Sequence, residues 1–115
     1  MQVTRINDAQ AYEAAGHFDV ASLRLQGHQA SETDNFWCGL SHYLPGGRAD
    51  MAGSPFEKVY VIVAGELTVI TEAGETVLGP LDSCHIAASE ARAVENRTNA
   101  VASMLVIVPN KPVSS

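Results

Sequence analysis

The feature that most constrains the fold is a stretch of strand-forming residues at positions 56–71. Val, Ile, Tyr and Thr dominate residues 56–64 and 66–71, and Gly65 stands between the two runs. Branched and aromatic side chains pack well on a pleated strand, and a glycine inside such a run marks a bend or a bulge. The stretch therefore predicts two consecutive β-strands.

Turn residues divide the chain beyond position 36 into short segments of the same character. Residues 36–44 form a predicted strand that ends at the breaker Pro45, Gly46 and Gly47. A hairpin turn at Ala73 and Gly74 is predicted to join residues 68–72 to residues 75–78. Further strands are predicted at residues 83–87, 91–96 and 101–108, with Asn99 at the last hairpin turn. Short strands at such spacing predict an all-β sandwich or barrel.

The first 35 residues are polar and mixed. Residues 9–15 can form one or two helical turns that end at Gly16, and residues 20–25 are predicted as a short strand. A chain of 115 residues has room for a single hydrophobic core. We therefore expect residues 1–35 to pack as an N-terminal segment on a barrel of residues 36–108. Residues 109–115 are predicted to form a flexible tail.

Charge and composition exclude several classes of partner. The chain has 7 basic and 13 acidic side chains, a net charge of −6, and this balance argues against nucleic acid as a partner. No apolar run approaches the roughly 18 residues of a membrane span, so no membrane association is expected. The polar start of the chain lacks the apolar core of a signal peptide, and Cys38 and Cys84 are isolated. We therefore expect free thiols and a cytoplasmic location.

The stretch from residue 45 to residue 68 carries the spacing of a known motif. It resembles the first motif of the small cupins, which runs Gly, five residues, His-x-His, three or four residues, Glu, six residues, Gly. Gly46 and Gly65 frame that spacing without a gap, and residues 92–96 resemble the family's second motif. The resemblance covers about residues 36–108. It implies a cupin-type double-stranded β-helix, which is a barrel related to the jelly roll.

The positions that hold metal ligands in the family carry other residues here. The slots of the first motif contain Ala52, Ser54 and Lys58, and the His slot of the second motif contains Arg92, with Asn96 retained at its end. The resemblance therefore implies no bound metal and no cofactor. Glu57 lies one position before the Glu slot, and a local bulge could turn it inward. One carboxylate without imidazoles is nevertheless a weak metal site.

Strand alternation indicates which side chains accompany these replacements. Tyr60 is expected to point into the barrel with Lys58, and Asn96 with Arg92. The ligand slots of the family converge, so the resemblance brings Lys58 and Arg92 close together. Two cations in a site of low dielectric constant lose hydration and repel each other, and an anion would offset both effects.

The leading hypothesis is therefore a pocket for a small anionic, carboxylate-bearing metabolite, which Lys58 and Arg92 bind. Tyr60 and Asn96 are expected to complete the pocket, and Arg48 after the glycine turn is expected to steer anions to the barrel mouth.

Two alternatives stay open at this stage, so the sequence leaves open whether the protein is an enzyme. In the first, the protein is a metal-free isomerase, lyase or decarboxylase that acts on a carbonyl acid. Arg92 would then anchor the carboxylate, and His85, Tyr60 or Lys58 would move the proton. In the second, the barrel is a structural or interaction module. There, carboxylates of this chain pair with the two cations, and the candidates are Asp50, Glu57 and Glu90.

The outward face of the same strand predicts the assembly. Val59, Val61 and Val63 are expected to form an apolar outer face. Such a face is best covered by a partner chain, and symmetric dimers are the commonest solution. We therefore expect a homodimer.

Overall fold

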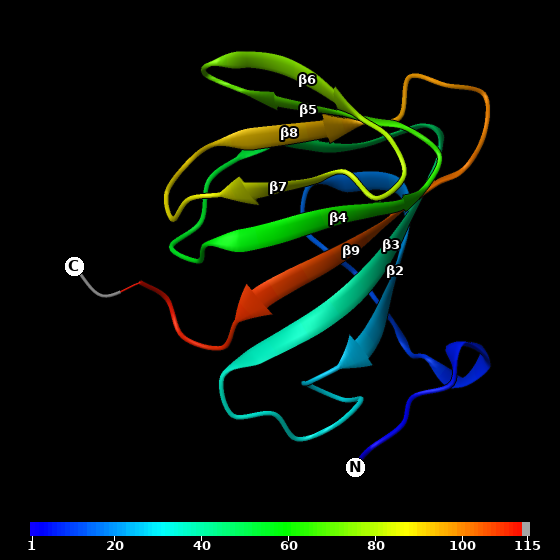
Figure 1. The fold of residues 1–115 in the computed structure, drawn as a ribbon, viewed down its shortest axis with the longest axis vertical. Coiled ribbons are helices and arrows are strands. Elements are labelled where there is room, and N and C mark those ends of the chain that lie inside the picture. The colour runs from blue at the N-terminus through cyan, green and yellow to red at the C-terminus, as the bar shows by residue number, and fades with distance from the viewer. Residues whose placement is uncertain (114–115) are drawn as a thin grey trace.

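The structure is a computed structural model, and it describes residues 1–113 of the chain. One short 3-10 turn, Ile6–Asp8, is followed by strands that account for most of the regular structure. Figure 1 shows these strands as a strongly curved sheet. The strands are β1 (Ala11–Tyr12), β2 (His17–Gln26), β3 (Phe36–Ala52), β4 (Lys58–Ala64), β5 (Leu67–Thr71), β6 (Gly74–Leu78), β7 (Ser83–Ile86), β8 (Arg92–Glu95) and β9 (Ala102–Pro109).

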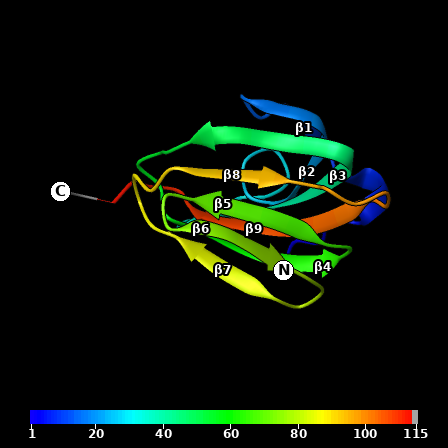
Figure 2. The ribbon, with the colours of Figure 1, turned by 90° about the horizontal axis from the view of Figure 1, so that it is seen from above.

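The sheet curls into a nearly closed barrel because β3 is long enough to pair with several neighbours. The strand order is β6-β5-β8-β3-β9-β4-β7, and β2 pairs with β3 while β1 pairs with β2. All of these pairings are antiparallel. The view from above shows β1, β2 and β3 on one side of the barrel, and β4 and β7 on the other (Figure 2). The predicted all-β barrel is confirmed.

The prediction that β3 ends at Pro45, Gly46 and Gly47 is wrong, because the strand continues to Ala52. Gly46 has φ +80°, a value that suits glycine and lets the strand bend without ending. The amide of Gly46 donates to the carbonyl of Asn96, and the amide of Asn96 donates to the carbonyl of Gly47. Strand β3 therefore continues past the two glycines, and its residues beyond them pair with β8.

The predicted bend at Gly65 and the predicted hairpin at Ala73 and Gly74 are confirmed, with φ values of +74° at Gly65 and +127° at Gly74 and with β5 paired to β6. The predicted last hairpin around Asn99 is wrong. Strand β8 pairs with β3 and β5, whereas β9 pairs with β3 and β4, so the two strands are not neighbours. A loop at residues 96–101 instead carries the chain from one part of the barrel to another.

The helical turns predicted for residues 9–15 are also wrong. Strand β1 pairs there with β2, and the amide of Arg24 donates to the carbonyl of Gln10. An isolated helix of this length is marginal in water, whereas the edge of β2 offers ready backbone partners. Strand β2 pairs along β3, so residues 17–26 belong to the barrel sheet together with residues 36–108. Of the predicted tail, residues 114–115 lie outside the described part.

The inner face of the barrel is buried as strand alternation predicts. Tyr60 and Ile62 on β4 are 2% and 0% exposed, and Val94 on β8 is fully buried, whereas Val63 is 39% exposed. These residues join a core that continues through Leu67 and other inward side chains. Polar groups at one end of this interior form the site described next. Within residues 1–113, no helix is long and apolar enough to cross a membrane.

Candidate functional site

A cavity of about 300 Å³ opens into the barrel between β2, β3, β4, β8 and β9. Its floor is apolar and is formed by Met104, Val106 and Val108 of β9. Three cationic side chains, Arg24, Lys58 and Arg92, belong to its wall. Concave sites of this kind, with an apolar base and a few polar groups, are typical binding sites for small molecules.

Within residues 1–113, Lys58 and Arg92 donate hydrogen bonds to neutral acceptors only. The Nζ of Lys58 donates to the Oγ of Ser54 at 3.1 Å. The Nε of Arg92 donates to the hydroxyl oxygen of Tyr60 at 2.7 Å, and its Nη1 donates to the backbone carbonyl of Asp50 at 3.1 Å. Among the described residues, neither cation forms an ion pair with a carboxylate. No carboxylate in the described part of the chain therefore neutralises the positive charge in this part of the cavity.

The carboxylates that could have neutralised these two cations have other partners. Asp50 accepts from the Nε of Arg48 at 3.0 Å, and Glu57 lies 3.1 Å from the Nε2 of His85. Glu90 accepts a hydrogen bond from the backbone amide of residue 87 at 2.9 Å. Glu57 is exposed, so a bulge does not turn it into the barrel. This arrangement weakens the interpretation of the barrel as a self-neutralised scaffold.

Burial and charge change the acidity of the groups in the cavity. Burial lowers the pKa of Lys58 from its ordinary value, and the charge of Arg92 lowers that pKa further. Burial raises the pKa of Tyr60, while the charge and the hydrogen bond of Arg92 act in the opposite direction. The tyrosine therefore keeps its proton near neutral pH, and the lysine has a larger neutral fraction than an exposed lysine.

The four positions that the resemblance assigns to metal ligands form two neighbouring pairs in the structure. Ala52 lies opposite Arg92 in the pairing of β3 with β8, and Ser54 is hydrogen-bonded to Lys58. These positions supply a methyl group, a hydroxyl and two cations, whereas protein metal sites use imidazole, thiolate and carboxylate. Among residues 1–113, no three His, Cys, Asp or Glu side chains form a group that could hold a metal ion. The residues present do not fit a metal ion.

A second cationic group lies at the wall formed by β1, β2 and β3. The guanidinium carbon of Arg24 is 3.6 Å from the ring centroid of Tyr12 and 4.9 Å from that of Trp37. The two aromatic rings are edge to face, with centroids 6.0 Å apart. Burial raises the pKa of Tyr12, so it also stays protonated. Flat aromatic surface beside a cation suits a ligand that combines apolar and anionic parts.

Sequence reasoning missed this group and also missed His17, whose pKa is lowered by burial. The available signal was the alternation in β2, which places Ser22 and Arg24 on one face. That face points inward, and Ser22 is only 4% exposed, with its hydroxyl 3.5 Å from that of Ser41. A polar face is ordinarily expected to face solvent, and the polar cavity reverses this expectation.

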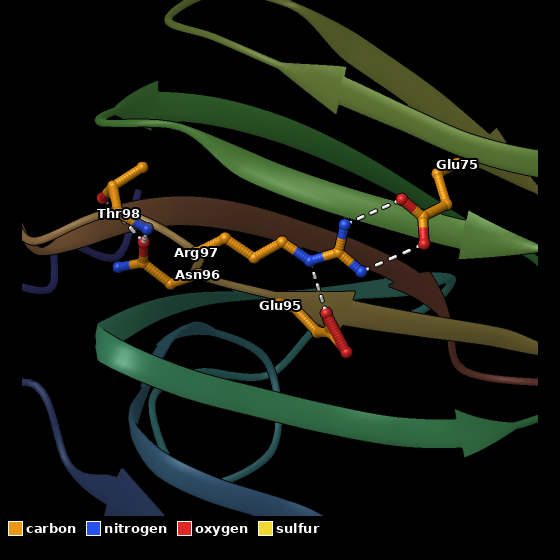
Figure 3. Close-up of polar contacts among 5 residues, drawn as sticks. All are labelled: Glu75, Glu95, Asn96, Arg97 and Thr98. Carbon is orange, nitrogen blue, oxygen red and sulfur yellow. Dashed lines mark hydrogen bonds and ion pairs between the residues drawn. The ribbon is translucent and has the colours of Figure 1, made fainter.

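Asn96 lies outside the lining of the cavity and instead fixes the loop after β8. Its amide donates to the carbonyls of Tyr43 and Ala100 at 2.9 and 2.8 Å. Its side-chain oxygen accepts from the amide and hydroxyl of Thr98 (Figure 3). Since Asn96 is 1% exposed and all of these bonds are internal, its place in the structure is that of a loop anchor.

Arg97, the next residue of the same loop, also makes contacts that stabilise the fold. Arg97 donates to both carboxylate oxygens of Glu75 on β6, at 2.7 and 3.0 Å, and to Glu95 at 2.7 Å (Figure 3). Both carboxylates raise the pKa of Arg97 above its already high value. This cation is already neutralised, in contrast to those of the cavity.

Two other predicted site residues also lie outside the lining. The guanidinium of Arg48 lies 4.3 Å from the ring centroid of Phe18 and pairs with Asp50. His85 is exposed and pairs with Glu57. Of the predicted residues, the structure therefore brings Lys58, Tyr60 and Arg92 together in the cavity.

Comparisons with known proteins give one strong match in sequence and several in structure. No family model matches the chain. The chain is 48% identical over 108 residues to the Mycobacterium tuberculosis protein named Beta-D-galactosidase Rv1717, and the match covers 94% of this chain and 93% of that protein.

Similar solved structures share the fold at low sequence identity. The polyketide cyclase RemF from Streptomyces resistomycificus matches with a TM-score of 0.86 at 15% identity, over 99% of this chain and 82% of that one. A cupin-2 domain from Rhodospirillum rubrum matches with a TM-score of 0.78 at 14% identity, over 99% and 77%. These likenesses confirm the predicted cupin-type fold.

Proposed function

The chain belongs to the family of the mycobacterial protein Beta-D-galactosidase Rv1717, with a cupin-type fold, and we propose that it binds a small carboxylate-bearing metabolite inside the barrel without a metal ion. One observation carries this proposal. Lys58 and Arg92 line a partly open cavity, and within residues 1–113 their hydrogen bonds go to neutral groups only.

The charge distribution explains why a carboxylate is the expected ligand. A half-buried cation without a counter-ion loses part of its hydration, and a neutral acceptor replaces that loss incompletely. Arg92 uses Nε and Nη1 for its internal bonds, so the remaining N–H groups of its planar head are available to a carboxylate. Lys58 adds a second positive charge to the same cavity, and the apolar floor accommodates the hydrocarbon part of the ligand.

The proposal is tested by thermal unfolding in the presence of small carboxylic acids. Pyruvate, lactate and their uncharged amides are compared, each with and without a chelator. We expect the acids to raise the unfolding temperature, the amides to leave it unchanged, and the chelator to have no effect. Arg92→Ala should abolish the shift, because a buried charged contact contributes roughly 2–5 kcal/mol when one partner is removed.

Arg48→Ala is the matched control, since Arg48 lies outside the lining and should leave the ligand-dependent shift intact. No stabilisation by any acid, in the parent protein as well as in the variants, would contradict the proposal. It would leave the barrel as a structural or interaction module.

Hydrolysis of a β-galactoside is a second candidate function, and the 48% identical relative favours it through its name. Glycoside hydrolysis ordinarily uses two carboxyl groups on either side of the scissile bond. The lining contains one carboxylate, Glu13, so this candidate would require Glu13 to work with a proton donor such as Tyr60. A chromogenic β-galactoside tests it directly. Turnover that Glu13→Gln abolishes, and that the exposed control Glu66→Gln retains, would establish this function.

We also propose that two copies of the chain associate through the outer face of β4 and β9. Val59 lies opposite Ile107, and Val61 lies opposite Leu105, so the apolar side chains continue across both strands. Ile107 is 37% exposed and the other three are half-buried. A second copy would remove this apolar surface from water, as symmetric dimers commonly do.

A further inference from the structure

We propose that Lys58 forms a covalent imine with the carbonyl carbon of a 2-oxo acid whose carboxylate is held by Arg92. This inference rests on the proposed function, because it needs an anion pocket, and it extends that function from binding to covalent chemistry. The substrate class follows from the amine of Lys58 and the guanidinium of Arg92, which line the same cavity. A carboxylate satisfies the guanidinium, and a carbonyl next to it places an electrophilic carbon beside the amine.

The position of Lys58 meets the geometric requirements of such an amine. It is one of two lysines in the chain, and it starts β4 on the face that lines the cavity. Its Nζ has one hydrogen-bond partner, the hydroxyl of Ser54, and no carboxylate partner among the described residues. The other lysine, Lys111, follows the last strand and is exposed.

The surroundings raise the fraction of the neutral, nucleophilic amine above that of an exposed lysine. Burial and the Arg92 charge both lower the pKa of Lys58, whereas a carboxylate partner would have raised it. A lysine activated by desolvation and by a nearby cation is a known route to amine nucleophiles. Here, both causes come from residues that line the same cavity.

Tyr60 supplies the acid that imine formation needs. Its hydroxyl oxygen accepts from Arg92 Nε at 2.7 Å, which leaves the O–H free to donate into the cavity. It lies two residues after Lys58 on the same face of β4, so its side chain emerges beside that of the lysine.

The chemistry balances without an oxidant or reductant. The lone pair of the neutral Lys58 amine attacks the carbonyl carbon, and one proton moves from nitrogen to oxygen to give a neutral carbinolamine. The C–O bond then breaks, and the hydroxyl leaves as water with the Tyr60 proton. An iminium ion remains on Lys58, and the phenolate of Tyr60 is paired with Arg92. The iminium can then accept the electrons of a bond between C3 of the acid and its substituent, giving a neutral enamine while the carboxylate stays on Arg92; breaking a C3–C4 bond in this way is the step required of a lyase.

Reductive trapping tests the inference. The full-length protein is incubated with pyruvate and sodium cyanoborohydride at neutral pH, and the adduct is located by mass spectrometry of peptides. We expect one reduced pyruvate adduct per chain at Lys58, formed faster than any adduct at Lys111 or at the N-terminal amine. The adduct at position 58 should be lost in Lys58→Met and retained in Lys111→Met, and it should form more slowly in Arg92→Ala.

Thermal unfolding of the same samples with pyruvate alone separates this inference from the proposed function. If pyruvate stabilises the protein and no adduct forms at Lys58, the imine is refuted and the anion pocket stands. If pyruvate and the other acids give neither stabilisation nor an adduct at Lys58, both proposals are refuted. Labelling of Lys58 and Lys111 at equal rates would also refute the proposed imine, because it would show that Lys58 is no more reactive than an exposed lysine.

Discussion

Replacing Lys58 with Met in the ligand-free protein tests whether the cavity carries unneutralised charge. The substitution keeps an unbranched side chain of similar length and removes the positive charge. It loses one hydrogen bond to a neutral hydroxyl, that of Ser54, which is worth about 0.5–1.5 kcal/mol. It also removes the desolvation of a half-buried ammonium and its repulsion with Arg92. These terms oppose each other, so the net change in unfolding free energy should lie within about 1 kcal/mol of zero or be stabilising.

The scaffold interpretation, in which a carboxylate of this chain pairs with Lys58, predicts a much larger loss of unfolding free energy for the same substitution. If Lys58 were paired with a buried carboxylate of this chain, its removal would leave that charge uncompensated and would cost roughly 3–5 kcal/mol. Urea unfolding at equilibrium, with Lys111→Met as the control, separates the two cases when the slope of the transition is unchanged. A loss of that size in Lys58→Met, with none in the control, would refute the anion pocket and favour the scaffold.

The pH dependence of the unfolding free energy, compared between the parent protein and Lys58→Met, tests the direction of the pKa shift of Lys58. The pKa of Lys58 is lowered in the folded state, so in the interval between its folded value and the ordinary 10.5 the unfolded chain binds more protons. The parent protein should therefore gain stability from Lys58 as the pH rises through this interval. Lys58→Met lacks this gain, so any stability advantage of the variant at pH 7 should shrink as the pH approaches 10.5. An advantage that grows with pH would contradict the sign of the shift.

Three further outcomes are expected. Elemental analysis of purified protein should find far less than one transition metal ion per chain, and a stoichiometric metal whose removal destabilises the protein would overturn the alignment of the ligand slots. Asn96→Ala should lower the unfolding free energy by about 1–3 kcal/mol, measured in urea, because it removes the buried side-chain donor to the carbonyl of Tyr43. Light scattering at micromolar concentration should show a dimer that Val61→Glu converts to a monomer, and a monomeric parent protein would contradict the proposed interface.

The part of the site on β4 and β8 could be predicted because it depends on strand alternation and on spacing. Residues 58–63 form one apolar strand that contains a single cation, Lys58. Since alternate residues of a strand share a face, Tyr60 lies on the same face as Lys58. The resemblance then placed Arg92 beside them. Asn96 shows the limit of this reasoning. Spacing locates the residue at the end of β8, but its hydrogen-bonding groups are used by backbone carbonyls and by Thr98, which no spacing reveals.

The wall formed by β1 and β2 could not be predicted, because the local sequence indicates an exposed strand face and a helix instead of a cavity wall. Ser22 and Arg24 form a polar face, and a polar face in a short strand ordinarily indicates exposure. Tyr12 falls in a segment whose alanines favour a helix, and only the free edge of β2 makes it a strand. Pairing partners far apart in sequence decide both cases, so local propensity is overridden.

The distribution of charge over the chain supports the cavity as the place where an anion binds. The chain is acidic overall, with a net charge of −6, yet three of its seven basic side chains, Arg24, Lys58 and Arg92, line one cavity. Glu13 is the one carboxylate residue in that lining. An acidic exterior repels a small anion from most of the surface, and low-dielectric walls concentrate the field of the cavity cations at its opening. This distribution of charge supports the proposal that an anion binds within the barrel, and a self-neutralised scaffold would not need it.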